Sequence, residues 1–194
     1  MSDLSRNKPL LILDLDETLI RGTTLQLPQE HFVVLHPYFV YKRPHVSDFL
    51  ASVSEHFSLA IWSSANMPYI AAIARPLWQG LPEPLFVWDR GYCMHRYNPY
   101  TNEIVYIKDL RKVASRGREL NRTLIVDDDL GKVTLHYGNA VLVKPFCGEP
   151  DDAELPLLAA YLGALAQNHE DLQRVDKAGW RNAGGQIAKM QVEI

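Results

Sequence analysis

The segment from Leu10 to Ile20, which reads L-L-I-L-D-L-D-E-T-L-I, constrains the fold more than any other stretch of the chain. Its apolar start, Leu10 to Leu13, has the length of a buried strand and is too short for the core of a helix. Side chains two apart in an extended backbone point to the same side, so Asp14 and Asp16 can converge just beyond the strand. Open α/β sheets bind ligands at this edge, and the segment therefore predicts an α/β fold with a site here.

Asp14 and Asp16 have a spacing that suits either metal binding or covalent chemistry. Two carboxylates this close favour a hard cation such as Mg2+, which takes oxygen ligands and commonly holds a phosphate as well. A carboxylate can also attack phosphorus, provided that a second group protonates the leaving oxygen and then activates water. The alternative is that the two aspartates only end a strand and cap the following segment, and this stretch alone favours neither interpretation.

A second apolar strand, Phe57 to Trp62, also ends in polar residues. Ser63 and Ser64 follow it, and Pro68 stands in the first turn of the helix predicted next. Spare backbone N–H groups at a helix N-terminus, together with a hydroxyl, form a ready anion site. Ser64 or Asn66 can equally serve only as the N-cap, which is the commoner role for an isolated serine.

A third apolar strand, Arg122 to Val126, runs into Asp127 and Asp128. Parallel strands bring their carboxyl ends to one edge of a sheet, so these carboxylates are expected close to those of the first strand. Such crowding is unfavourable unless a cation is present or a proton is shared. Lys108 ends another predicted strand, although a lysine at a strand end is usually a solvated charge.

Helices and a further strand complete a repeated pattern of strand, polar turn and helix. Helical spacing predicts one helix from Pro44 to about His56 and a closing helix from Asp152 to Gln167, with a strand at Ala140 to Val143 between them. We therefore expect one domain over residues 1–168. Residues 169–194 are polar with several glycines, which predicts a partly disordered tail.

Two segments interrupt this pattern. A hairpin rich in valine and aromatic residues is predicted over about residues 22–41, and we interpret it either as a flap over the acidic edge or as an ordinary edge hairpin. A small antiparallel insertion is predicted over about residues 85–107, with short strands around 86–88, 92–95 and 104–107.

Composition narrows the setting. The chain is 47% hydrophobic with a net charge of −3, which is typical of a soluble globular protein and gives no overall basic field for nucleic acid or an anionic membrane. Cys93 and Cys147 form no disulfide framework or metal-type spacing, and the N-terminal apolar run is too short for a signal sequence or a membrane span. We expect a cytoplasmic protein without nucleic-acid or membrane partners, and the sequence specifies no oligomeric state.

The polar residues at the strand ends, taken together, resemble the four motifs of the haloacid-dehalogenase (HAD) superfamily of phosphatases. Further similarity is to its FCP/SCP-like group, which contains the RNA polymerase II C-terminal-domain phosphatases. The similarity spans roughly residues 9–167. The segments that carry it are D-L-D-E-T-L at 14–19, Y-K-R-P-H-V-S-D-F-L at 41–50, I-W-S-S at 61–64, Y-I-K-D-L at 106–110 and L-I-V-D-D at 124–128.

This resemblance implies a Rossmann-like parallel sheet flanked by helices without a large cap domain, dependence on Mg2+, and an aspartyl-phosphate intermediate. Asp14 is then the nucleophile and a metal ligand, and Asp16 is the general acid and base, which also binds the metal through its carbonyl. The supporting roles implied by the motifs fall to Thr18, which steadies the loop, to Ser63 and Ser64, which bind the phosphoryl oxygens, to Lys108, which neutralises charge, and to Asp127 and Asp128 as metal ligands.

Asp128 departs from the family pattern, because eukaryotic members usually have asparagine there. The extra carboxylate is expected to act through a metal-bound water or to pair with Lys108. Asp16 faces a different demand, since an unperturbed aspartate has a pKa of about 3.9. A proton on it during catalysis requires apolar surroundings or a neighbouring negative charge, such as that of Asp14.

The expected activity is Mg2+-dependent hydrolysis of a phosphomonoester. The resemblance favours phosphoserine or phosphothreonine in a protein or peptide as the substrate. A small phosphorylated metabolite is the alternative, and a non-catalytic phosphate-binding or interaction module is a second alternative from another class.

Overall fold

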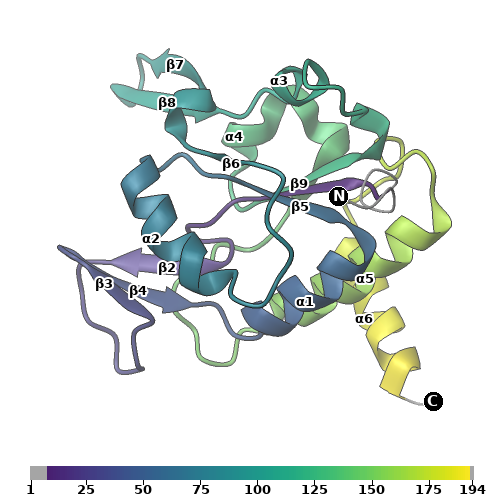
Figure 1. Ribbon diagram of the computed structural model, residues 1–194, viewed down its shortest axis with the longest axis horizontal. Helices are drawn as coiled ribbons and strands as arrows, with labels where there is room; N and C mark the ends of the chain where they lie inside the picture. The colour runs from purple at the N-terminus through teal and green to yellow at the C-terminus, as the bar shows by residue number, and fades with distance from the viewer. Residues whose placement is uncertain (1–7, 193–194) are drawn as a thin grey trace.

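The computed structural model describes residues 8–192, and its centre is a parallel β-sheet (Figure 1). Among these residues the sheet has five strands in the order β10-β9-β1-β5-β6. β1 is the middle strand, paired with β5 on one side and β9 on the other. The strands are β1 (Leu10–Leu13), β5 (Ser58–Trp62), β6 (Val87–Trp88), β9 (Thr123–Asp127) and β10 (Ala140–Leu142).

Alternate residues of β1 belong to two separate cores, one on each face of the sheet. Leu11 and Leu13 pack into the larger core, whereas Leu10 and Ile12 pack into the smaller one. The helices over the larger core are α1 (Val46–His56), α2 (Met67–Leu77) and α5 (Glu154–Asn168). The helices over the smaller core are the short α3 (Arg111–Ala114) and α4 (Leu130–Val133). This layered arrangement confirms the predicted α/β class.

Short 3-10 helices connect several of these elements. They are η2 (Arg90–Tyr92), η3 (Leu120–Arg122) and η4 (Thr134–Asn139). No helix within residues 8–192 combines the length and the apolar character that crossing a membrane requires.

The hairpin expected over residues 22–41 is part of a larger antiparallel sheet, which we call the flap sheet. β3 (Val33–Leu35) and β4 (Tyr38–Lys42) form the hairpin around the cis bond of His36-Pro37. β2 (Ile20–Thr23) continues directly from the loop after β1 and pairs with the other side of β4. The flap sheet therefore joins the acidic edge through the chain itself.

The antiparallel insertion is smaller than the sequence predicted. It consists of β7 (Met94–Asn98) paired with β8 (Glu103–Ile107). The expected strand at 86–88 instead forms β6 and pairs in parallel with β5, so its assignment to the insertion is wrong. Packing explains the position of β6. The Trp88 ring lies edge-on to the Trp62 ring with 4.8 Å between the ring centres, and both residues are buried.

The C-terminal segment contains α6 (Trp180–Val192), which lies beside α5 (Figure 1). Trp180 is 2% exposed, and its indole N–H donates to the Leu142 carbonyl at 2.9 Å. A Cβ on Gly184 would overlap the Leu157 carbonyl, so glycine allows the two helices to approach closely. The prediction of a partly disordered tail fails for this helix, because the glycine that suggested disorder serves packing. Residues 193–194 lie outside the described chain.

Candidate active site

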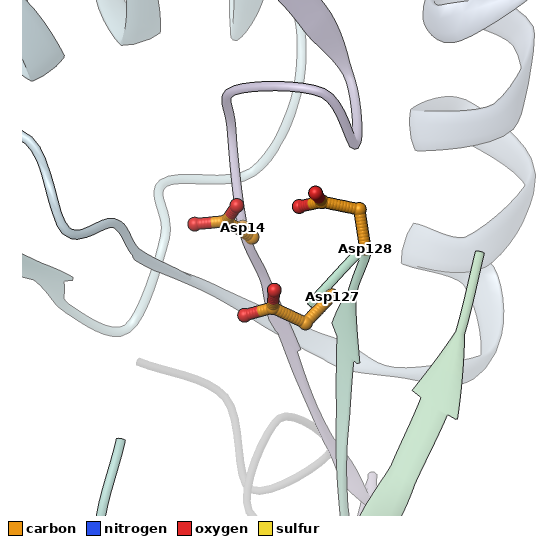
Figure 2. Close-up of side chains that lie close together, drawn as sticks. All are labelled: Asp14, Asp127 and Asp128. Carbon is orange, nitrogen blue, oxygen red and sulfur yellow. The ribbon is translucent and has the colours of Figure 1, made fainter. Parts of the chain in front are cut away.

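β1 and β9 end side by side, and this places three carboxylates together. The Asp14 N–H donates to the Val126 carbonyl at 3.1 Å, so the two strand ends are in register. Figure 2 shows the side chains of Asp14, Asp127 and Asp128 gathered at this edge. One carboxylate oxygen of each lies within 4.8 Å of the others. These residues are called the carboxylate cluster below.

Lys108 is buried inside the acidic edge and is not a solvated charge. Its ammonium donates to Oδ1 of Asp14 at 2.7 Å and to Oδ2 of Asp127 at 2.6 Å. Its backbone N–H donates to the Lys132 carbonyl at 2.7 Å, which fixes the end of β8 against α4. Burial alone would lower the pKa of Lys108, but Asp127 and Asp14 outweigh that effect and raise it. The buried ammonium therefore stays charged and holds Asp14 in place.

Lys132 is a second cation at the cluster, and sequence reasoning missed it. Its Nζ lies 3.5 Å from Oδ2 of Asp14, 3.7 Å from Oδ1 of Asp127 and 3.5 Å from Oδ1 of Asp128. Burial lowers its pKa, but the surrounding carboxylates raise it by more. A lysine four residues after an aspartate, at the start of a helix, was the one signal in the sequence.

Asp128 occupies a different environment from Asp127. Burial, opposed by Lys132 and reinforced by Asp14, raises the pKa of Asp128 to about 6. Its Oδ1 also accepts a long hydrogen bond of 3.4 Å from the Thr18 hydroxyl. The expected pairing of Asp128 with Lys108 is wrong, because Lys132 is its ion-pair partner.

Asp16 is not a member of the carboxylate cluster, and its carboxylate contacts α2. Its Oδ1 accepts a hydrogen bond of 2.6 Å from the Tyr69 hydroxyl, a partner that the sequence did not predict. Burial raises the pKa of Asp16 to about 6, the Tyr69 hydrogen bond opposes this rise, and the charge of Asp14 adds to it. Asp16 can therefore carry a proton closer to neutral pH than an ordinary aspartate, which is the property that a general acid needs.

The loop after β1, which carries Asp14 and Asp16, is held in place by Arg43. Its guanidinium donates to the Thr18 carbonyl at 3.0 Å and makes two hydrogen bonds of 2.8 Å to Asp152. Arg43 and Thr18 are both buried. Arg43 lies within the Y-K-R-P-H segment, but its role in the loop is set by contacts that only the fold provides.

Ser63 and Ser64 lie in the turn between β5 and α2. The buried Ser63 hydroxyl accepts the Ala65 N–H at 3.0 Å. The N-cap of α2 is Asn66, whose side chain accepts the Tyr69 N–H at 3.0 Å. The alternative that Ser64 or Asn66 serves as the N-cap is therefore confirmed for Asn66, and the Ser63 hydroxyl lies at the sheet edge that carries Asp14.

A cavity of about 290 Å³ opens beside Asp16. The flap sheet, α2 and η2 all contribute to its walls. The residues that line it are Asp16, Gly22, Tyr38, Ala65, Asn66, Tyr69 and Arg90.

The donor set of the carboxylate cluster fits Mg2+, which prefers oxygen ligands and is commonly bound through one or two carboxylates. Oδ2 of Asp14 is buried and has no hydrogen-bond partner among residues 8–192. The Lys132 ammonium, 3.5 Å away, satisfies this oxygen only weakly, and a bound cation would satisfy it better. Asp14, Asp127 and Asp128 are the residues that would hold the ion.

Comparisons with known proteins identify relatives of this chain. A family model described as NLI interacting factor-like phosphatase matches residues 9–173. The chain is 33% identical to a CTD small phosphatase-like protein 1 of Caenorhabditis elegans, over 77% of this chain and 30% of that one. It is 30% identical to nuclear envelope morphology protein 1 of Schizosaccharomyces pombe, over 82% of this chain and 34% of that one. The chain thus spans about a third of the length of these two relatives.

The fold is also similar to that of solved phosphatases. The structure of Fcp1, an essential RNA polymerase II CTD phosphatase, superposes with a TM-score of 0.55 at 17% identity, covering 96% of this chain and 63% of that one. The expectation of a cytoplasmic location is contradicted, because the relative from S. pombe is named for the nuclear envelope. Composition could not reveal this, because it reports overall charge and solubility and not a place in the cell.

The central parallel sheet, the aspartates at its edge and the family match over residues 9–173 lead to one conclusion. The chain belongs to the NLI interacting factor-like phosphatase family and has the fold of the FCP/SCP-like HAD phosphatases.

Proposed function

We propose that this chain is a Mg2+-dependent phosphomonoester hydrolase that works through an aspartyl-phosphate on Asp14. The observation that carries the proposal is the environment of Asp14, which is buried, accepts a hydrogen bond of 2.7 Å from Lys108 and lies beside Asp127 and Asp128. A carboxylate fixed in this way can attack phosphorus without first losing rotational freedom.

Each residue at the edge has a step in this mechanism. Asp14 attacks phosphorus, while Asp16 gives its proton to the leaving oxygen. In the second step Asp16 takes a proton from the water that attacks the aspartyl-phosphate, which releases inorganic phosphate and restores both residues. Mg2+, held by Asp14, Asp127 and Asp128, would neutralise charge on the phosphoryl oxygens.

Two further groups support the phosphoryl position. Lys108 keeps a fixed positive charge beside Asp14, where negative charge develops during transfer. Ser63 and the turn that leads into α2 lie at the same edge and are placed to bind phosphoryl oxygens. This arrangement supplies alignment and positive charge, which are the main requirements of phosphoryl transfer.

We infer that the substrate is phosphoserine or phosphothreonine in a protein or peptide. The cavity beside Asp16 supports this inference, because its lining combines the Tyr38 ring from the flap sheet with Arg90 from η2. An aromatic ring and a guanidinium can contact residues that flank a phosphorylated side chain. The names of a relative, a CTD small phosphatase-like protein, and of a structural neighbour, an RNA polymerase II CTD phosphatase, support the same class.

The test is phosphate release by the purified chain from phosphoserine, phosphothreonine and phosphotyrosine peptides, sugar phosphates and nucleotides. We expect a phosphoserine or phosphothreonine peptide to have the highest kcat/KM, since contacts away from phosphorus hold the reacting group in line. A sugar phosphate or nucleotide that outperforms every peptide would establish the metabolite alternative instead.

The covalent step is tested with Asp14→Asn, which cannot form the intermediate and should show no turnover. Asp48→Asn is the matched control, because it makes the same chemical change at an exposed position on α1. Intact-protein mass spectrometry of Asp16→Asn after substrate addition should detect a phosphorylated chain. Turnover by Asp14→Asn near that of the control would exclude the mechanism, and activity in excess chelator would exclude the metal.

A further inference from the structure

The Lys132 ammonium stands at the carboxylate cluster where a divalent cation is expected. Its distances of 3.5, 3.7 and 3.5 Å to oxygens of Asp14, Asp127 and Asp128 are nearly equal. These are the residues that offer ligand oxygens to a metal. Lysine and metal therefore share the same carboxylates as their partners.

Lys132 differs from Lys108 in how firmly it is held. Lys108 is fully buried and makes two hydrogen bonds shorter than 2.8 Å. The Lys132 side chain is 18% exposed, and each of its carboxylate contacts is longer than a good hydrogen bond. A long side chain with an exposed end can turn toward solvent while its backbone stays in place. Lys132 can thus leave the cluster, whereas Lys108 cannot.

Lys132 compensates the negative charge that Asp128 adds to the cluster. A third carboxylate increases the attraction of the cluster for a divalent cation, but it also increases repulsion when no cation is bound. Lys132 lies four residues after Asp128 and forms an ion pair with it at 3.5 Å. The charges of the two residues therefore cancel, so the pair adds no net charge to the surroundings of Asp14.

We propose that Lys132 is a built-in counter-cation that Mg2+ displaces, and that the Asp128–Lys132 pair sets the Mg2+ affinity of this chain. This inference rests on the proposed Mg2+ site. It concerns binding in the resting protein and is independent of which phosphate ester is hydrolysed. The charge on Lys132 is constant throughout, so the exchange is one cation for another.

The experiment is isothermal titration calorimetry of Mg2+ into chelator-treated protein at one neutral pH. Lys132→Met should bind Mg2+ on the order of tenfold more tightly than the wild type, because the competing charge is gone. Lys132→Arg retains the charge and should stay close to the wild type. Lys42→Met removes an exposed lysine of β4 whose ammonium lies 4.2 Å from the centre of the Phe32 ring, outside the cluster, and should also leave the affinity unchanged.

Asp128 is tested in a double-mutant cycle with Lys132. Asp128→Asn alone should weaken Mg2+ binding on the order of tenfold, because a ligand is lost while the competing cation remains. Asp128→Asn with Lys132→Met should return toward the wild-type affinity, since both charges of the pair are removed. The double variant also keeps the net charge of the wild type, which guards against a failure of Lys132→Met to fold.

Thermal unfolding gives a second readout without turnover. In chelator, Lys132→Met should melt below the wild type, and added Mg2+ should raise its midpoint by more than it raises that of the wild type. Mg2+ binding by the wild type with unchanged affinity in Lys132→Met would overturn this inference and leave the proposed metal site intact. Absence of Mg2+ binding in every variant would overturn both, whereas binding only after Lys132 is removed would support the competition directly.

Discussion

The Tyr69 hydroxyl donates a hydrogen bond of 2.6 Å to Oδ1 of Asp16, and this contact joins the first turn of α2 to the loop after β1. It holds the Asp16 carboxylate beside the cavity. Tyr69 is therefore a positioning residue for the proposed general acid.

Tyr69→Phe tests this role through the pH profile. The hydrogen bond lowers the pKa of Asp16, so its loss should raise that pKa and move the alkaline limb of kcat/KM to higher pH. Rates with alkyl phosphates should fall by about tenfold and those with p-nitrophenyl phosphate by less, because a good leaving group needs little protonation. Tyr97→Phe on the β7–β8 hairpin is the control. Equal losses with both substrates and an unmoved limb would assign Tyr69 a purely structural role.

Gly22 provides the space in which this contact forms. A Cβ at Gly22 would lie 2.6 Å from the Tyr69 oxygen and 3.4 Å from Oδ1 of Asp16. Gly22→Ala should therefore displace the phenol and lower activity toward alkyl phosphates. Gly22→Ala combined with Tyr69→Phe should be no worse than Tyr69→Phe alone, because the clashing oxygen is gone. Additive losses in the double variant, measured by kcat/KM, would contradict this account.

Lys108→Met should remove both stability and activity. It leaves the carboxylates of Asp14 and Asp127 buried without their partner, which typically lowers the free energy of unfolding by about 3–5 kcal/mol. Loss of the fixed charge should lower kcat by about a hundredfold or more. Urea unfolding and steady-state kinetics measure the two effects. Lys112→Met, whose ammonium contacts a backbone carbonyl at the surface, should change neither.

The pH dependence of stability in chelator follows from Asp16 and Asp128. Burial raises the pKa of each from 3.8 to about 6, so the folded state holds more protons than the unfolded state between these values. The free energy of unfolding should therefore fall as pH rises from about 4 to 6. Asp128→Asn should reduce the slope in urea titrations at several pH values. A stability that rises across this window would show that the carboxylates are better compensated than their burial indicates.

Trp180→Ala tests whether α6 is part of the folded domain. The ring is buried against Tyr161 and donates to the Leu142 carbonyl, so its removal should lower the free energy of unfolding by about 3–5 kcal/mol. Trp180 lies outside the proposed active site, so kcat measured at low temperature should be unchanged. Arg174→Ala removes a side chain that is 88% exposed and should leave the unfolding curve unchanged. An unfolding curve of Trp180→Ala that matches the wild-type curve would mean that α6 is not part of the folded domain, as the prediction of a disordered tail holds.

The sequence by itself determined the elements whose signal is local. The apolar runs that became β1, β5 and β9 are short, and each runs directly into a polar residue, Asp14, Ser63 or Asp127. Parallel pairing then brings Asp14 and Asp127 to one edge whatever the rest of the chain does. The fold class and the principal aspartates were predictable for this reason, and the family resemblance carried Lys108 with them.

Tertiary structure alone decided the partners of those residues. Tyr69 reaches Asp16 from another layer, 53 positions along the chain, and Arg43 reaches Asp152 across 109 positions. The sheet position of β6 and the order of α6 likewise depend on Trp88 and Trp180 finding buried partners. The hydrophobic pattern of a segment shows which of its residues face the core and which face solvent. Contacts between side chains of distant segments depend on how the layers pack, and no local pattern encodes that packing.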